Sequence, residues 1–154
     1  MIARVPGRPT ARPATSGAPK PPGAKVLLTE DDEAVRAFVR RALELDGHRV
    51  TTAEDGADSL AILERDPEAF DLLLTDVKMP RMDGIALAKR ARSLSPRLII
   101  LLMTGFADQR ERADELDGVV REVIPKPFTL PDLRRAVAQA LAEGAPDGSA
   151  SEPL

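Results

Sequence analysis

Residues 72–84 read LLLTDVKMPRMDG, and this stretch gives the main indication of the fold and of a functional site. Its apolar start predicts a buried strand, and that strand ends on an acid, Asp76. The Pro and the Asp-Gly pair that follow indicate a turn leading into a helix. A single carboxylate at the end of a strand can simply cap the next turn. The role of Asp76 therefore depends on what the other segments bring to it.

Apolar runs and amphipathic stretches alternate on both sides of this stretch. Strands are expected at 25–29, 48–53, 70–76, 97–104 and 119–124. Helices are expected at 31–47, 57–66, 84–95, 108–116 and 130–143. This alternation predicts an α/β fold with a doubly wound, parallel, five-stranded sheet that helices cover on both faces.

The two ends of the chain differ in composition from its middle. Residues 1–24 hold six of the 14 prolines and four basic residues, with no acid and little apolar content, which predicts a disordered basic tail. Residues 144–154 are expected to form a second disordered tail. The intervening residues 25–143 are expected to form one domain.

Composition argues against several kinds of site. The chain has no Cys and one His, so thiolate sites and His-based metal sites are excluded. The predicted domain carries 18 basic and 23 acidic residues, and the chain lacks Trp and Tyr, which argues against nucleic-acid binding. No apolar run has the length of a membrane span or the form of a signal peptide. We therefore expect a cytoplasmic protein that binds neither nucleic acid nor membrane.

Polar side chains follow the predicted strands at their carboxyl ends, the edge where open α/β sheets bind ligands. They are Glu30, Asp31 and Asp32 after the first strand, Asp76 at the end of the third, Thr104 and Gly105 at the fourth and Lys126 after the fifth. Several carboxylates in one site repel one another unless a cation enters, and oxygen ligands suit Mg²⁺. Lys126 suits a phosphate oxygen. The remaining carboxylate, Asp76, is expected to accept a phosphoryl group.

Four segments together resemble the receiver domain of two-component response regulators, in the CheY-like superfamily. They are LLTEDDE (27–33), LLLTDVKMPRMDG (72–84), LLMTG (101–105) and IPKPF (124–128). The resemblance covers residues 25–143 and implies the flavodoxin-like strand order 2-1-3-4-5. It also implies that the chain is a phosphoacceptor with self-phosphorylation and self-dephosphorylation chemistry only, rather than an enzyme.

The resemblance implies a role for each acid. Asp76 would take the phosphoryl group from a histidine kinase or a histidine phosphotransfer protein. Mg²⁺ would be held by Asp31 directly, by Glu30 through water, by Asp76 and by the backbone carbonyl of Lys78. Phosphorylation would then shift an equilibrium between two conformations and change a protein-binding surface.

The same resemblance implies that Thr104, Lys126 and the Gly105 amide meet the phosphoryl oxygens, and that the Lys126–Pro127 peptide is cis. One position departs from the family pattern. Many receivers carry Tyr or Phe three residues before the Lys, where this chain has Val123. A Val has no ring to rotate, and Phe106 is an alternative reporter of the Thr104 position.

A finer resemblance is to single-domain receivers of the CpdR kind, which act as adaptors for regulated proteolysis. It rests on LLTEDDEAVRAFVRRALELDGHRVT (27–51), DLLLTDVKMPRMDGIALA (71–88) and KPFTLPDLRRAV (126–137). Only a short tail follows Glu143, so we expect the output to be binding of a protein partner such as a protease complex. A phosphorelay shuttle or phosphate sink between His-containing proteins is the alternative.

Two other classes of protein fit the sequence less well. An aspartyl-phosphate phosphatase of the haloacid dehalogenase type needs a second acid two residues after the nucleophile, where this chain has Lys78. A flavin or nucleotide binder needs a phosphate-cradling loop after the first strand, where this chain has consecutive acids. Turnover of p-nitrophenyl phosphate with Mg²⁺ would favour the phosphatase.

Other polar residues are expected to have local roles. We expect helix-start acids at Glu54, Asp55 and Asp58 and a cap and turn at Asp83–Gly84. His48 is expected to be a surface or structural residue. The polar helix at 108–116 is either a solvated face or the surface that carries the output signal.

Overall fold

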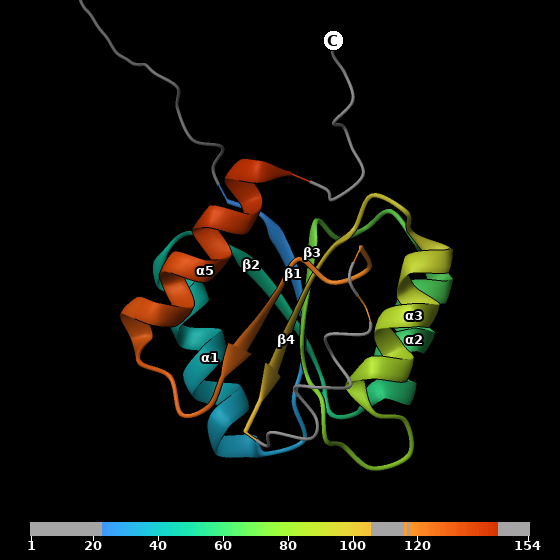
Figure 1. Ribbon diagram of the computed structural model, residues 1–154, viewed down its shortest axis with the longest axis horizontal. Helices are drawn as coiled ribbons and strands as arrows, with labels where there is room; N and C mark the ends of the chain where they lie inside the picture. Colours follow the sequence, from blue (N-terminus) through green and yellow to red (C-terminus); the bar gives the residue numbers. More distant parts are fainter. Residues whose placement is uncertain (1–22, 106–115, 117, 145–154) are drawn as a thin grey trace, which may run out of the picture.

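The computed structural model describes residues 23–105, 116 and 118–144. Its strands are β1 (Lys25–Thr29), β2 (Arg49–Ala53), β3 (Leu72–Asp76), β4 (Ile99–Thr104) and β5 (Glu122–Pro125). Its helices are α1 (Glu33–Leu45), α2 (Gly56–Arg65), α3 (Gly84–Leu94) and α5 (Leu130–Glu143) (Figure 1). The helix expected at 108–116 lies outside the described residues, apart from Leu116.

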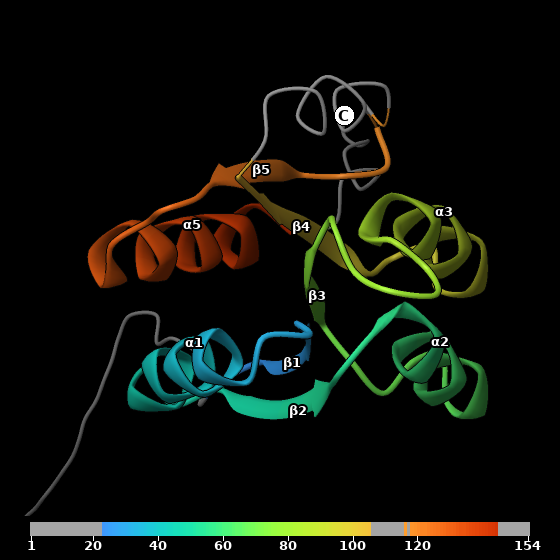
Figure 2. The same ribbon diagram turned by 90° about the horizontal axis from the view of Figure 1, so that it is seen from below.

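The five strands form one parallel sheet in the order β2-β1-β3-β4-β5. This order confirms the predicted doubly wound α/β fold. Figure 2 shows α1 and α5 on one face of the sheet and α2 and α3 on the other. Because helices cover both faces, every residue of β3 and β4 is buried, whereas β2 at the edge alternates between exposed and half-buried positions up to its buried last residue.

Two apolar clusters hold the layers together, one on each face of the sheet. Leu74 and Leu101 pack on the side of α1 and α5, and the adjacent Leu73 and Ile100 pack on the side of α2 and α3. Successive residues of a strand point to opposite faces, so each central strand contributes to both clusters. Burial of one such Leu side chain contributes about 2 kcal/mol, and the clusters thereby fix the strand ends relative to one another.

The described helices begin with side-chain caps close to the carboxyl ends of the strands. Asp32, Asp55, Asp83 and Thr129 each accept a hydrogen bond from the backbone amide three residues later. Such caps satisfy amides that have no partner within the helix. The expected start of the first helix at residue 31 was wrong by two residues, because Asp32 is its cap.

The last strand begins later than the sequence predicted. Val119 and Val120 were expected in it, but their amides donate to the Leu116 carbonyl in a turn, next to Gly118 at φ 91°. The ladder with β4 begins at Glu122. Both valines pack against the cluster on the side of α2 and α3, and Val120 forms only a single β-bridge before the Arg121 amide donates to the Ile100 carbonyl of β4.

His48 lies at the amino end of the sheet, where it binds the backbone before β1. Its Nδ1 accepts a hydrogen bond from the Ala24 amide at 3.0 Å. Ala24 is buried, and its carbonyl accepts a hydrogen bond from Arg49 at the start of β2. This agrees with the structural role expected for His48.

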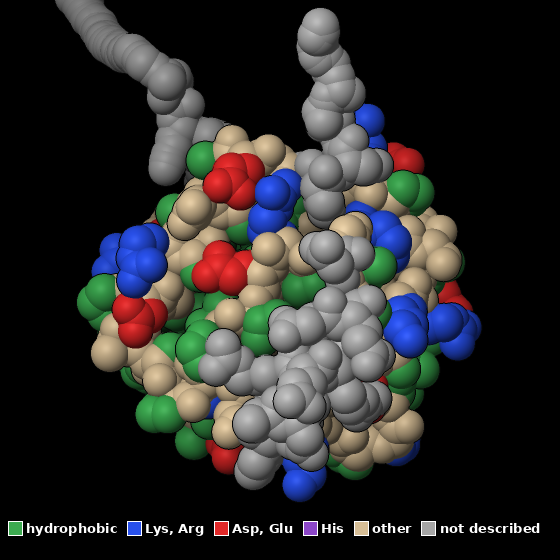
Figure 3. Space-filling view, viewed as in Figure 1, with side chains coloured by type: hydrophobic (Ala, Val, Ile, Leu, Met, Phe, Trp, Pro, Cys, Tyr) green, Lys and Arg blue, Asp and Glu red, His purple; other side chains and the backbone are tan. Residues whose placement is uncertain are grey.

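Charged side chains cover much of the exterior. Figure 3 shows Lys and Arg side chains gathered over α3, where Lys89 and Arg90 are exposed. In the described part of the chain, no helix combines the length and the apolar character needed to cross a membrane.

Candidate functional site

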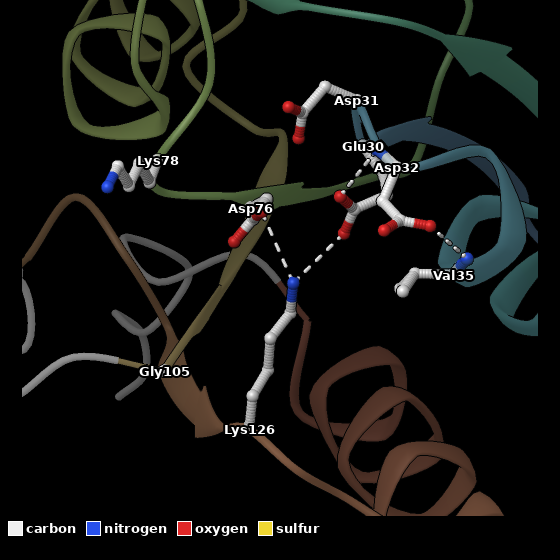
Figure 4. A pocket seen from close by; sticks show the side chains of 8 residues that line it. All are labelled: Glu30, Asp31, Asp32, Val35, Asp76, Lys78, Gly105 and Lys126. Atoms are coloured by element: carbon white, nitrogen blue, oxygen red, sulfur yellow. Dashed lines mark hydrogen bonds and ion pairs between the residues drawn. The ribbon is translucent and has the colours of Figure 1, made fainter.

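The carboxyl edge of the sheet holds a cavity of about 370 Å³. Figure 4 shows its lining, which is Glu30, Asp31, Asp32, Val35, Asp76, Lys78, Gly105 and Lys126. The parallel register brings these residues together, because Thr29 lies beside Thr75 and Asp76 lies beside Met103. Most of the residues that the sequence singled out at different strand ends therefore share one cavity.

Three carboxylates meet in this cavity, those of Glu30, Asp31 and Asp76. One oxygen of each lies within 4.8 Å of the corresponding oxygens of the other two. Glu30 and Asp76 are buried, with 1% and 8% of their surface exposed, whereas Asp31 is exposed. Because like charges this close repel one another, the cluster favours a positive group at its centre.

Lys126 brings that charge from the segment after β5. Its Nζ lies 3.1 Å from Glu30 Oε1 and 3.2 Å from Asp76 Oδ2, so a single ammonium is shared by two buried carboxylates (Figure 4). The Lys126 amide donates to the Thr104 carbonyl at 2.8 Å and continues the ladder beyond β5. The Lys126–Pro127 peptide is cis, as predicted.

Backbone amides fix the orientation of both buried carboxylates. The Asp32 amide donates to Glu30 Oε2 at 3.0 Å, and the Val77 amide donates to Asp76 Oδ1 at 2.9 Å. Arg36 from α1 donates to the Glu30 carbonyl at 2.8 Å. Each carboxylate thus has one oxygen held by the backbone and the other directed toward Lys126.

Burial governs the ionisation of these acids. It raises the pKa of Glu30 from 4.5 to about 7, and the nearby Asp76 charge acts in the same direction. Burial likewise raises the pKa of Asp76, against the attraction of Lys126 and its hydrogen bond. For Lys126, burial alone would lower the pKa, but attraction to Asp76 and Glu30 outweighs it and the pKa is raised. The ammonium is therefore held charged, while one positive charge does not offset the burial of two carboxylates.

The donor set fits a hard divalent cation. Every candidate ligand of the three acids is an oxygen, the type that Mg²⁺ prefers. Three carboxylates face one ammonium, so a divalent ion would neutralise the excess charge. Lys78 also lines the cavity, and its side chain extends away from the carboxylates (Figure 4). The residues present therefore fit Mg²⁺.

Comparison with known proteins identifies the family. The family model described as the response regulator receiver domain matches residues 26–138. The chain belongs to this family. It is 42% identical over 117 residues to the response regulator receiver protein CpdR of Brucella abortus, an alignment that covers 76% of this chain and 96% of CpdR. It is 36% identical to the response regulator MprA of Mycobacterium leprae, covering 82% of this chain and 54% of MprA, so it spans about half the length of that relative.

Solved structures agree with this assignment. A response regulator receiver domain protein from Clostridium thermocellum superposes with a TM-score of 0.72 at 27% identity, covering 78% of this chain and 95% of that one. The receiver domain of the hybrid histidine kinase CckA superposes with a TM-score of 0.64 at 32% identity, covering 76% of this chain and 98% of that one. The fold and the family predicted from the sequence are thus confirmed.

Within this receiver, Thr104 and Gly105 lie at the end of β4. Thr104 is the last residue of the strand and is 1% exposed, and it does not itself line the cavity. Gly105, the next residue, does line it. Its position beside Lys126 would leave ordinary contact distance, 3.6 Å, for an added Cβ, so space alone does not require Gly here.

The position that departs from the receiver pattern is Val123, the second residue of β5. It is half-buried and packs against the cluster on the side of α2 and α3. Phe106, the alternative reporter named from the sequence, lies outside the described residues. The part that either residue plays in a switch stays a prediction.

One interaction near the site was missed by the sequence reading. Asp55 was expected to be a helix-start acid and nothing more. It does cap α2, but it also accepts a hydrogen bond from Arg81, in the loop after β3, at 2.9 Å. The Arg gave no signal in the sequence, because MPRMDG reads as a turn whichever residue stands between Pro80 and Met82.

Proposed function

We propose that residues 25–143 form a phosphorylation-controlled switch in which Asp76 accepts a phosphoryl group from a phosphohistidine. The observation that carries this proposal is the setting of Asp76. Its carboxylate ends a buried strand at an accessible cavity, lies 3.2 Å from Lys126 and is grouped with two further acids. A cap for a turn would need none of these partners.

In the transfer, a carboxylate oxygen of Asp76 forms a bond to phosphorus as the bond between phosphorus and the histidine nitrogen breaks. The nitrogen leaves with the electron pair and takes up a proton from solvent. Glu30, Asp31, Asp76 and the Lys78 carbonyl would hold Mg²⁺. When bound, that ion neutralises charge on the transferring oxygens.

The other residues at this edge stabilise the product. Lys126 already contacts Asp76, so its ammonium would pair with an oxygen of the new phosphoryl group. Thr104 and the Gly105 amide would donate to the remaining oxygens, and the movement of Thr104 would bias the conformational equilibrium. Water would later remove the phosphoryl group from Asp76.

The proposed output is binding of another protein in the cytoplasm, and the donor is a histidine kinase or a histidine phosphotransfer protein. The alignment with CpdR covers nearly all of that protein. The sequence motifs also resemble those of single-domain receivers that serve as proteolysis adaptors. We therefore propose a protease complex as the downstream partner.

Phosphoramidate, which carries a P–N bond as phosphohistidine does, tests the acceptor directly. With Mg²⁺, intact-mass measurement should show one added phosphoryl group on the wild type and none on Asp76→Asn. Asp71→Asn is the matched control, because Asp71 precedes β3 at the opposite edge of the sheet and should leave the modification intact. Equal modification of Asp76→Asn would refute the assignment.

A second experiment tests the output. Purified candidate partners are captured with the wild type, with Asp76→Ala and with wild type treated with beryllofluoride and Mg²⁺, which mimics the phosphoryl group. The switch is supported if treatment changes partner binding of the wild type and does not change partner binding of Asp76→Ala. Identical binding in all samples would exclude it. Onward transfer of the phosphoryl group to a second His-containing protein would favour the shuttle.

A further inference from the structure

The loop between β3 and α3, residues 77–83, contains one unusual backbone conformation. Arg81 has φ 69°, and no other non-glycine residue in the described part of the chain has a positive φ. This left-handed region is usually occupied by Gly, which has no Cβ to crowd the backbone, or by Asn, whose short polar side chain can hydrogen-bond locally. An Arg in this conformation therefore suggests that its side chain makes a compensating interaction.

The compensating partner is Asp55, at the start of α2. The Arg81 Nε donates to Asp55 Oδ2 at 2.9 Å, and Nη2 contacts the same oxygen. Asp58 lies nearby, with Oδ1 3.9 Å from Arg81 Nη2. Asp55 is buried, and the hydrogen bond from the Asp58 amide, together with Arg81, lowers its pKa. The carboxylate that holds the guanidinium is thus oriented by the α2 cap and favoured in its charged form.

The backbone of the loop also contacts its surroundings closely. A Cβ added to Gly56, the first residue of α2, would lie 2.4 Å from the Met82 carbonyl oxygen. At the far end of the loop, the Gly84 amide donates to the Val77 carbonyl at 2.7 Å, and a Cβ added to Gly84 would lie 2.0 Å from the Asp76 carbonyl oxygen. The two ends of the loop are therefore hydrogen-bonded to each other, and the loop backbone lies close to Asp76 at the end of β3 and to Gly56 at the start of α2.

We propose that Arg81 and Asp55 form a positioning pair that holds the 77–83 loop, and with it the Lys78 carbonyl, in the geometry that binds Mg²⁺. This inference rests on the proposed function. Lys78 lies three residues before Arg81 and lines the same cavity as Asp76. Neither Arg81 nor Asp55 lines that cavity, so an effect of the pair on ion binding has to pass through the loop.

If the Arg81–Asp55 pair only stabilised the fold, its loss would change the thermal midpoint and leave Mg²⁺ binding as it is. The Arg81 side chain is 64% exposed, and ion pairs with an exposed partner contribute little to folding. The chain offers a matched control in Arg90, which reaches Glu64 on α2 from α3 with Nη2 3.9 Å from Oε2 and is similarly exposed. That pair joins α3 to α2 and does not involve the 77–83 loop.

The test is the Mg²⁺ dissociation constant, measured by titration calorimetry. Arg81→Gly removes the guanidinium and relieves the left-handed strain, and Asp55→Asn keeps an oxygen for the cap while it removes the charge. Both variants should bind Mg²⁺ roughly tenfold more weakly than the wild type, as outer-shell variants of metal sites do. The double variant should be no weaker than either single one. Arg90→Ala should bind as the wild type does, and the thermal midpoints of Arg81→Gly and Arg90→Ala should stay close to that of the wild type.

Hydrogen exchange of the 77–83 amides in Mg²⁺-free protein gives a reading that does not depend on the ion. Exchange should be faster in both Arg81→Gly and Asp55→Asn and unchanged in Arg90→Ala. Wild-type Mg²⁺ affinity in the two variants, or unchanged exchange, would overturn the positioning role while leaving the proposed function intact. A wild type that binds no Mg²⁺, or binding that survives in Asp31→Ala, would overturn the proposed function and this inference with it.

Discussion

Removing the charge of Glu30 is expected to stabilise the Mg²⁺-free protein at neutral and mildly alkaline pH. The Glu30 side chain is 1% exposed, and burial raises its pKa from 4.5 to about 7. The folded state therefore holds a proton that the unfolded state has already lost. The stabilisation that the raised pKa of Glu30 contributes is fully present below pH 4.5 and is lost as the pH rises through about 7. Glu30→Gln keeps the shape and polarity of the side chain without the titration.

The size of the effect follows from the two pKa values. Within that window each pH unit lowers the free energy of unfolding by about 1.4 kcal/mol, which gives a total of about 3 kcal/mol. About 2 kcal/mol of this falls between roughly pH 5.5 and pH 8. The free energy of unfolding of Glu30→Gln should therefore be closer to that of the wild type at roughly pH 5.5, and should exceed it by about 2–3 kcal/mol at roughly pH 8.

The assay is urea denaturation followed by far-UV circular dichroism, since the chain has no Trp or Tyr for fluorescence. Metal-free samples are compared across this pH range, and Glu68→Gln, an exposed Glu at the opposite edge of the sheet, is the control. With excess Mg²⁺ the wild type should regain stability at the higher pH. If the profiles of the wild type and Glu30→Gln run parallel, burial of a charged Glu30 does not oppose folding and the reasoning fails.

Three further predictions concern the site and its support. Asp76→Asn should raise the thermal midpoint without Mg²⁺ and remove the stabilisation that Mg²⁺ gives. In the wild type that stabilisation is about 2.7 kcal/mol at an Mg²⁺ concentration one hundred times the dissociation constant. Calorimetry is run with and without Mg²⁺, and a thermal midpoint of the variant that still rises with Mg²⁺ would contradict the prediction. Gly84→Ala should lower the free energy of unfolding by about 2–3 kcal/mol and slow phosphorylation by phosphoramidate, because its Cβ would lie 2.0 Å from the Asp76 carbonyl oxygen. Thr129→Ala removes the capping box of α5 and should lower the unfolding free energy by about 1 kcal/mol in urea with an unchanged phosphorylation rate; a change in that rate would show that α5 is coupled to the site.

The fold was predictable because its main signals are local. Apolar runs bounded by turn residues predicted the strands, and alternation with amphipathic stretches predicted a parallel sheet between helices. The error in β5 shows the limit of that signal. Val119 and Val120 pack against the cluster on the side of α2 and α3, yet the turn at Gly118 holds Val119 outside the sheet, and Val120 forms only a single β-bridge. An apolar pattern reports burial, and strand pairing also requires an extended backbone.

The grouping of site residues was predictable for a different reason. In a parallel sheet all carboxyl ends lie at one edge, so residues far apart in the sequence are brought together by topology alone. The link from Arg81 to Asp55 depends instead on a left-handed backbone at a residue that rarely adopts it. Nothing in the residue type reports that conformation, so the partner of Asp55 could be found only in three dimensions.

The energetics of the cavity favour a binding role for its charges. Burial raises the pKa of both Glu30 and Asp76, which means that the folded chain disfavours their charged forms even with Lys126 between them. Folding stability is a small difference between large terms, so excess charge worth a few kcal/mol is a substantial burden. Neutral side chains would relieve this excess negative charge, and so would a divalent cation bound to the carboxylates. A strand that ends on Asp76 is thus poorly explained by folding alone and well explained by a site that binds a cation beside a phosphoacceptor.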